Sequence, residues 1–168
     1  MGSLVILRGN SGSGKTTIAK ELQKRLGRNT MRISQDAVRR DMLCVEDGPD
    51  TKALPLLMEL LRYGSEHSRV VILEGILRAD WYRPLFTLAG QLYPVEKIRA
   101  YYLDLSFEET VRRHQTRPKC QEFGREEMRR WWREKDFSDV LQEVRIGAAM
   151  DLEQIAAEIC LQVQDEVE

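Results

Sequence analysis

The chain has 168 residues, of which 42% are hydrophobic and 32% charged, and this length and composition predict one globular domain over residues 1–168. No apolar run approaches the roughly 20 residues that span a bilayer, so the sequence excludes a membrane protein. The net charge of −1 gives no global attraction to nucleic acid, although the positive charges are unevenly distributed.

The chain begins with a predicted strand, a glycine-rich loop and a helix. Residues 4–7 form a short apolar run of the kind that makes a buried strand. After the loop, Ile18, Leu22 and Leu26 recur every four residues, and Gly27 suits the C-terminal cap of the helix that they predict.

The glycine-rich loop matches the phosphate-binding pattern G-x-x-x-x-G-K-[ST], in the strand and helix context that this motif requires. Its glycines let backbone N–H groups point at a β-phosphate, Lys15 bridges the β- and γ-phosphates, and the Thr16 hydroxyl ligates Mg²⁺. We therefore predict ATP and Mg²⁺ as cofactors. The predicted nucleotide site has nine residues: Gly9, Asn10, Ser11, Gly12, Ser13, Gly14, Lys15, Thr16 and Thr17.

The same loop occurs in GTPases, motor ATPases and phosphotransferases, so the rest of the chain must distinguish these classes. The sequence contains no N-K-x-D motif that reads guanine, and 168 residues are too few for most motor ATPases with their coupling elements. Phosphotransferase is therefore the leading class.

A carboxylate and two arginines follow the second predicted strand, Thr30–Ser34. Asp36, Arg39 and Arg40 stand at i, i+3 and i+4, so they share one face of the helix that Asp36 begins. In doubly wound sheets the ligand crevice lies at the carboxyl ends of the strands, where this helix starts. The residues alone leave two interpretations open, a ligand site or a helix cap with solvated arginines.

The middle of the chain predicts a helix within residues 51–66, a buried strand over 69–75 and a helix between 80 and 92. Glu74 closes the strand where many P-loop proteins carry an Asp that holds Mg²⁺ through water. We assign Glu74 to both the metal site and the acceptor site, with a purely structural role as the third interpretation.

Beyond this strand, residues 98–105 predict a fourth strand, and 106–109 have the spacing of a capping box that opens another helix. A polar stretch over 116–124 interrupts this helix, and a second helical piece follows over 125–135. A fifth strand is predicted at Glu143–Ile146.

The final helix is predicted to start at Asp151, which forms a cap with Gln154. Strands alternate with helices along the whole chain, which predicts right-handed crossovers and an α/β class with a five-stranded parallel sheet between two helical layers.

Residues 112–133 form a positively charged segment. They include eight Lys and Arg residues against three Glu residues, a local charge of +5, while the rest of the chain carries −6. Trp131 and Trp132 face different sides of the predicted helix, so we expect one in the core and the other over the adjoining hinge. His114, without a partner in the sequence, is weak support for catalysis.

Four segments in this order resemble the P-loop kinases grouped around zeta toxin, chloramphenicol phosphotransferase and the kinase domain of polynucleotide kinases. They are LRGNSGSGKTTIAKEL, RISQDAVRRDM, VVILEGIL and YYLDLSFEETVRRHQTRP. The resemblance covers nearly the whole chain and implies a three-layer, nucleoside-kinase-like P-loop NTPase fold with a small arginine-bearing lid at approximately 113–125.

The resemblance also implies roles for individual residues. Asp36 occupies the place of the base that accepts the proton of the acceptor hydroxyl, and Arg39 and Arg40 would hold the acceptor. Arg113 and Arg117 are the lid candidates for stabilising transferred charge. Together with Lys15, we predict Asp36, Arg117 and Arg113 as the catalytic residues.

The predicted function is transfer of the γ-phosphoryl group of ATP to a hydroxyl of a small molecule: a nucleoside, sugar, nucleotide-sugar or antibiotic. A polynucleotide 5'-hydroxyl kinase is the alternative, but the chain lacks a broad basic surface, so no nucleic-acid partner is expected. A non-catalytic nucleotide switch would leave Asp36 and the lid arginines without a shared purpose.

The cysteines and the N-terminal residues bear on the compartment. Cys44, Cys120 and Cys160 are odd in number and far apart, which predicts reduced thiols rather than disulfides or a zinc site. The N-terminal residues contain no secretory signal and no myristoylation signal, so we expect a cytoplasmic protein.

Overall fold

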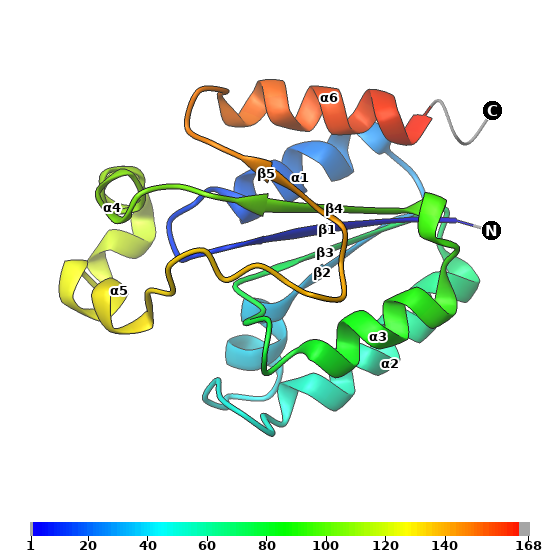
Figure 1. Cartoon of the computed structure of the whole chain (residues 1–168), viewed down its shortest axis with the longest axis horizontal. Helices are drawn as coiled ribbons and strands as arrows, with labels where there is room; N and C mark the ends of the chain where they lie inside the picture. Colours follow the sequence, from blue (N-terminus) through cyan, green and yellow to red (C-terminus); the bar gives the residue numbers. More distant parts are fainter. Residues whose placement is uncertain (1, 165–168) are drawn as a thin grey trace.

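Five parallel strands form one sheet in the order β2-β3-β1-β4-β5 in the computed structural model, which describes residues 2–164 (Figure 1). The strands are β1 Ser3–Gly9, β2 Thr30–Ser34, β3 Val70–Gly75, β4 Ile98–Leu103 and β5 Glu143–Ile146. All four pairings between neighbours are parallel, which confirms the predicted α/β class and the five-stranded sheet.

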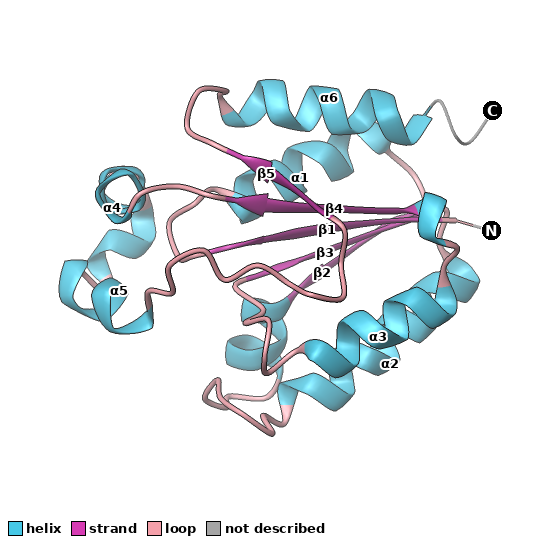
Figure 2. Ribbon diagram, viewed as in Figure 1, coloured by secondary structure: helices cyan, strands magenta, loops and turns pink. Residues whose placement is uncertain are grey.

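Helices cover both faces of the sheet. Helices α1 and α6 lie over one face and α2 and α3 over the other, while α4 and α5 stand beyond the carboxyl ends of the strands (Figures 1 and 2). Their bounds are α1 Lys15–Leu26, α2 Ala53–His67, α3 Arg83–Leu92, α4 Phe107–Gln115, α5 Arg125–Trp131 and α6 Leu152–Gln164. Within residues 2–164, no helix combines the length and apolar character needed to cross a bilayer.

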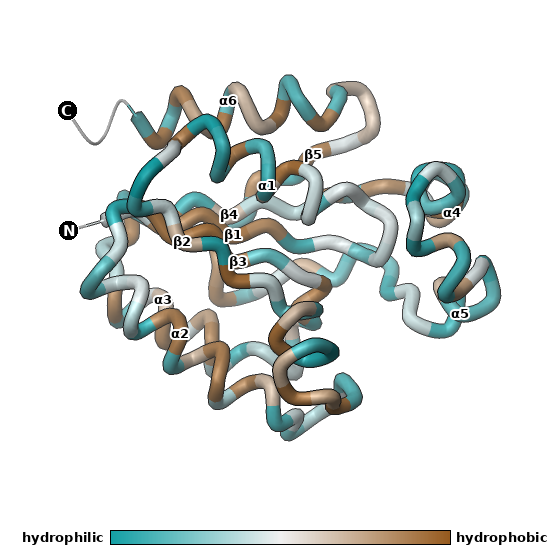
Figure 3. Tube along the Cα trace, turned by 180° about the vertical axis from the view of Figure 1, so that it is seen from behind, coloured by the Kyte–Doolittle hydropathy of each residue, from teal (hydrophilic) through white to brown (hydrophobic). Residues whose placement is uncertain are grey.

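The core is divided by the sheet, because successive side chains of a strand point to opposite faces. In β1, Leu4 and Ile6 join the cluster under α2 and α3, whereas Val5 and Leu7 join the cluster under α1 and α6. Figure 3 shows the resulting hydrophobic strands at the centre of the molecule. A third, small cluster around Met128 joins α4 to α5.

The strand register brings the predicted site residues to one edge. Arg8 is opposite Gly75, and Ser34 is opposite Glu74, so the phosphate loop, the Asp36 turn and the end of β3 leave the sheet side by side. Ligand sites of open parallel sheets lie at this edge.

Several local predictions are confirmed. The C-terminal cap residue Gly27 has φ 76°, and β5 occupies the predicted residues. At the start of α6, Asp151 and Gln154 cap each other through side chain to backbone hydrogen bonds of 2.8 and 3.2 Å.

Other local predictions are corrected. The helix after Asp36 is a short π-helix, Ala37–Met42, and the helical piece after Gly124 ends at Trp131 instead of Lys135. The capping box at Ser106 is only half formed. The Ser106 Oγ accepts a hydrogen bond from the Glu109 N–H at 3.2 Å, but the Glu109 carboxylate turns to neighbouring arginines instead of the Ser106 backbone.

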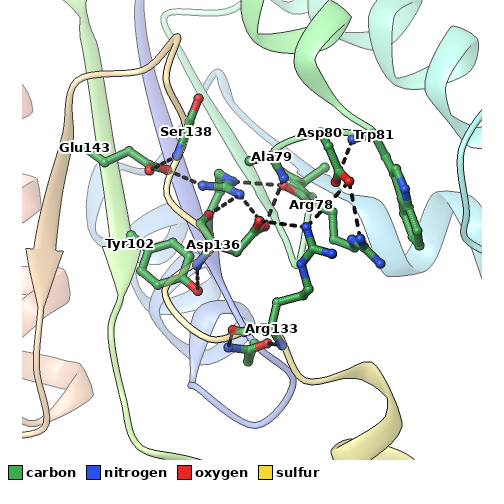
Figure 4. Close-up of polar contacts among 12 residues, drawn as sticks. Arg78, Ala79, Asp80, Trp81, Tyr102, Arg133, Asp136, Ser138 and Glu143 are labelled. Carbon is green, nitrogen blue, oxygen red and sulfur yellow. Dashed lines mark hydrogen bonds and ion pairs between the residues drawn. The ribbon is translucent and has the colours of Figure 1, made fainter.

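A buried arginine in β1 connects distant parts of the chain. The apolar pattern of residues 4–7 did not predict this role. Arg8 is fully buried, and its guanidinium donates to the Glu143 carboxylate at 2.6 Å and to the carboxylate and carbonyl of Asp136 at 3.0 and 2.9 Å. Asp136 also accepts from the Ala79 N–H at 2.9 Å (Figure 4). The Arg8 cluster (Arg8, Asp136 and Glu143) therefore fixes the loop between α5 and β5 to the centre of the sheet.

Candidate active site

A cavity of about 740 Å³ opens at the carboxyl edge of the sheet. Its wall combines the phosphate loop, the Asp36 turn, the end of β3 and the segment from α4 to α5 that we call the lid, residues 113–125. Of the predicted catalytic and acceptor-binding residues, the cavity wall contains Lys15, Asp36, Arg39, Arg40, Glu74 and Arg117.

The phosphate loop depends on glycine at two positions. Gly12 and Gly14 have φ values of 80° and 98°, which favour glycine. A Cβ added at Gly12 would lie 2.6 Å from the Thr110 carbonyl oxygen of α4, and one at Gly14 would lie 2.7 Å from Leu152 of α6. The loop is therefore packed closely between α4 and α6.

The predicted nucleotide residues differ in their positions. Ser11, Gly12, Lys15 and Thr16 line the cavity. The Asn10 side chain instead holds Arg133 through two hydrogen bonds to its backbone, at 2.7 and 2.9 Å. Thr17 is exposed and lies outside the cavity wall.

Lys15 is a buried cation that points along the loop. Its ammonium donates to the Asn10 carbonyl at 2.8 Å and to the Ser13 hydroxyl at 3.3 Å. Burial lowers the pKa of Lys15 to about 8, although the negative charge of Glu74 opposes this shift. The site thus holds a lysine whose charge an anionic ligand would stabilise.

Thr16 and Glu74 lie side by side, as a metal site would require. The Thr16 hydroxyl donates to both carboxylate oxygens of Glu74, at 3.1 and 3.2 Å, and Glu74 is only 2% exposed. Hydroxyl and carboxylate oxygens suit Mg²⁺, which normally completes its shell with phosphate oxygens and waters. The described residues contain no cluster of three or more His, Cys, Asp or Glu side chains that would bind a metal alone.

Asp36 stands among three cations. Its carboxylate contacts the ammonium of Lys119 at 2.8 Å and the guanidinium groups of Arg40 and Arg39 at 2.9 and 3.1 Å. Burial raises the pKa of Asp36, but the hydrogen bond and charge of Lys119, with the charges of Arg40 and Arg39, outweigh burial and lower the pKa. Asp36 is therefore ionised at neutral pH and able to accept a proton.

Lys119 is a site residue that the sequence analysis missed. It was counted among the positive charges, but its contact with Asp36 joins residues 83 positions apart. Its place in the positive segment after Pro118 was the only signal available. Lys119 closes the lid tip over the predicted base.

Arg117 is held inside the cavity by His114. The Nε2 of His114 lies 2.8 Å from the Phe123 carbonyl, which can only accept, so this nitrogen carries the proton and Nδ1 accepts from the Arg117 guanidinium at 3.1 Å. His114 is buried and stacks on Phe123. Burial lowers the pKa of Arg117, an effect that Asp36 opposes. His114 positions Arg117 in the lid.

Arg113 lies at the outer side of the phosphate loop. Its guanidinium donates to the Ser13 carbonyl at 2.9 Å and to Glu109 at 2.9 Å, and it does not line the cavity. In this conformation Arg113 braces the loop, and Arg117 is the lid arginine that faces the cavity.

The two tryptophans take different positions, but neither is buried in the core, which corrects the expectation for one of them. Trp132 packs edge-on against Phe107 in the small lid cluster, whereas Trp131 is 39% exposed and packs against Phe123. Both tryptophans also line the cavity. Arg78 and Trp81, from the loop after β3, line it as well, and the sequence did not indicate either of them as a site residue.

Comparison with known proteins yields one family and several solved structures. Residues 4–136 match the model of the family AAA_33, described as an AAA domain. No curated protein matches the chain.

The solved structures share the fold at low identity. A gluconokinase from Sinorhizobium meliloti has 18% identity and a TM-score of 0.62, and the match covers 99% of this chain and 93% of that one. An APS kinase from Mycobacterium tuberculosis in complex with AMPPNP and APS has 16% identity and a TM-score of 0.63, over 97% and 98% of the two chains. A shikimate kinase from Acinetobacter baumannii has 16% identity and a TM-score of 0.61, over 99% and 95%. These likenesses confirm the small P-loop kinase fold, while the narrower resemblance to zeta toxin and its group stays a prediction.

Proposed function

Because the chain belongs to the AAA domain family AAA_33, and because Asp36 lines the same cavity as Lys15 and Thr16, we propose that the protein is an ATP-dependent kinase with a hydroxyl acceptor. The position of Asp36 carries the proposal. An acceptor with a phosphate oxygen is already anionic and needs no base, whereas a hydroxyl must lose its proton during transfer.

Each residue has a defined part in the proposed reaction. Lys15 binds the β- and γ-phosphates, and Thr16 and Glu74 would hold Mg²⁺, which neutralises phosphate charge when bound. The acceptor oxygen attacks the γ-phosphorus, the bond to the ADP oxygen breaks, and the acceptor proton passes to the Asp36 carboxylate. The proximity of Glu74 to Thr16 favours the metal role of Glu74 over acceptor contact.

The lid has two parts in this proposal. Arg117 stabilises the charge that spreads over the transferring phosphoryl group, and closure of residues 113–125 excludes water. Lys119 competes with the acceptor hydroxyl for the Asp36 carboxylate, because Lys119 contacts Oδ2 while Arg39 and Arg40 already share Oδ1. We treat residues 1–168 as one kinase domain with this lid.

The structure offers little support for a nucleic-acid acceptor. Two arginines of the positive segment, Arg112 and Arg125, are occupied by Glu109 and Glu108 at 2.7 Å. The acceptor classes that we propose are therefore a nucleoside, sugar, nucleotide-sugar or antibiotic.

The proposal is tested by incubating the protein with labelled ATP, Mg²⁺ and a library of hydroxyl compounds. We expect one compound to gain the mass of a single phosphoryl group. Phosphorylation of an oligonucleotide 5' end, or slow release of ADP without any labelled product, would contradict the proposal.

Replacing Arg117 should separate catalysis from nucleotide binding. We expect Arg117→Ala to lower kcat about 100-fold and to change the Kd of ATP by less than about threefold, because the guanidinium meets charge that develops during transfer. Steady-state kinetics and nucleotide titration measure the two effects. Arg112→Ala is the matched control, because Arg112 is exposed and lies outside the cavity. An unchanged kcat in Arg117→Ala would contradict the catalytic role of Arg117.

Nucleotide binding should take up protons above neutral pH. The pKa of Lys15 is about 8 in the free protein, and contact with phosphate oxygens raises it, so the bound state holds more protons and affinity falls by up to about tenfold per pH unit above pH 8. Calorimetric titration with a non-hydrolysable ATP analogue at pH 8.5, in buffers of different protonation enthalpy, measures the uptake. Lys15→Arg retains the charge without titrating, so its binding heat should be independent of the buffer; a buffer-independent heat in the wild-type protein would contradict the prediction.

A further inference from the structure

The loop between β3 and α3 presents a guanidinium stacked on an indole at the cavity wall. The Arg78 guanidinium carbon lies 3.7 Å from the centre of the Trp81 ring, and both side chains line the cavity. A guanidinium held flat against an aromatic ring keeps its N–H groups directed outward in the ring plane, an arrangement that suits a carboxylate or phosphate.

Arg78 has unused donor capacity. Its one side-chain partner is Asp80, at a long 3.3 Å, and its Nε is buried with no hydrogen-bond partner among residues 2–164 (Figure 4). Because this Nε has almost no accessible surface, a ligand in the cavity would meet the terminal N–H groups of the guanidinium instead.

A second guanidinium lies near Arg78. Arg133 approaches the same Asp80 carboxylate at 3.5 Å, so two cations share one half-exposed carboxylate at this end of the cavity. Asp136, the other partner of Arg133 at 3.8 Å, is already held by Arg8. With Arg8 and Glu143 included, three arginines and three carboxylates balance in this group, so the positive charge that an anion would meet is that of the cavity wall.

The wall of the whole cavity carries a net positive charge. Eight Lys and Arg side chains line it, against four Asp and Glu side chains, an excess of four. A nucleoside triphosphate with its Mg²⁺ brings a net charge of about −2, which offsets only part of this excess. The remainder favours a second ligand that is itself negative.

The Arg78 loop is also fixed relative to the proposed base. The Leu77 N–H donates to the Gln35 side-chain oxygen at 3.0 Å, and Gln35 directly precedes Asp36. The Gln35 amide in turn donates to the Tyr82 hydroxyl at 2.8 Å. Gln35 thus bridges the Asp36 turn to the start of α3, which sets the span between a hydroxyl at Asp36 and an anionic group at Arg78.

From these contacts we infer that the acceptor carries an anionic oxygen group, a carboxylate or a phosphate, which binds the Arg78 guanidinium beside Trp81 while its hydroxyl faces Asp36. This inference rests on the proposed kinase function and adds the charge of the substrate to it.

The test uses sets of hydroxyl compounds that share one ring and differ in the group at one carbon, such as glucose, glucuronate and glucose 6-phosphate, within the labelled-ATP assay. We expect only the compounds that already carry an anionic group to gain a phosphoryl group. Arg78→Gln should raise the KM of such an acceptor at least about tenfold and should leave the KM of ATP within about twofold of the wild-type value. Arg78→Lys should recover part of the affinity. Arg83→Gln removes an exposed arginine whose partner is Asp139, outside the cavity, and serves as the control.

The outcomes separate this inference from the kinase proposal. If a neutral compound is phosphorylated and Arg78→Gln turns it over like the wild-type protein, the inference is wrong and the kinase proposal stands. If no compound is phosphorylated, the anion site is tested by the shift in melting temperature that the same compounds cause in the presence of a non-hydrolysable ATP analogue. A stabilisation by the carboxylate or phosphate member that Arg78→Gln abolishes supports the anion site, and no shift with any anionic compound overturns it.

Discussion

Asp36→Asn is expected to lower kcat about 10²- to 10⁴-fold while leaving the KM of ATP almost unchanged. The amide has nearly the shape of the carboxylate but cannot take the proton of an acceptor hydroxyl, so it removes general-base assistance without removing bulk. Steady-state kinetics on the acceptor found in the library assay, with thermal unfolding as a check on folding, provide the measurement.

Asp41→Asn is the matched control for this variant. Asp41 lies on the same short π-helix, is exposed and does not line the cavity, so its substitution should leave kcat unchanged. Near-normal turnover by a folded Asp36→Asn protein would show that Asp36 orders the neighbouring arginines without acting as a base.

Arg8→Met is expected to lower the free energy of unfolding by about 3–5 kcal/mol. The variant keeps an apolar stem but leaves the carboxylates of Asp136 and Glu143, 10% and 4% exposed, without their cation. Removing one partner of a buried ion pair is costly because the remaining charge is not solvated. The Arg8 guanidinium also lies 5.2 and 5.5 Å from the ring centres of Phe86 and Tyr102, contacts that methionine does not replace electrostatically. Urea unfolding measures the loss.

Arg25→Met tests whether any arginine would give this result. Arg25 also has two acidic partners, Glu21 and Glu153, but it is 33% exposed, and such pairs contribute about 0–1 kcal/mol. Similar losses in the two variants would contradict a special role for the Arg8 cluster.

The predictable parts of the molecule are those governed by local sequence. The phosphate loop follows from glycine and lysine spacing, and the convergence of Asp36, Arg39 and Arg40 follows from helical periodicity that even a short π-helix preserves. The short strand β5 also occupies the four residues where it was predicted, Glu143–Ile146.

The remaining parts depend on contacts that no local pattern records. Arg8 reaches partners 128 and 135 residues away, and its position in an apolar strand gave no sign that acidic residues would surround it. Lys119 contacts Asp36 only because the lid folds over the edge of the sheet. Arg78 could not be predicted as a site residue because its place in the cavity depends on the loop after β3, which stacks it on Trp81.

The Arg8 cluster has a mechanical consequence for the lid. The segment that returns from α5 is anchored by Asn10 at Arg133 and by Arg8 at Asp136, so both anchors lie beyond residues 113–125, the proposed lid. The lid tip, by contrast, is held by half-exposed contacts such as Lys119 with Asp36, each worth about 1 kcal/mol or less. In the proposed closure, the lid swings by breaking its weak outer contacts, while the two strong anchors on its C-terminal side stay intact.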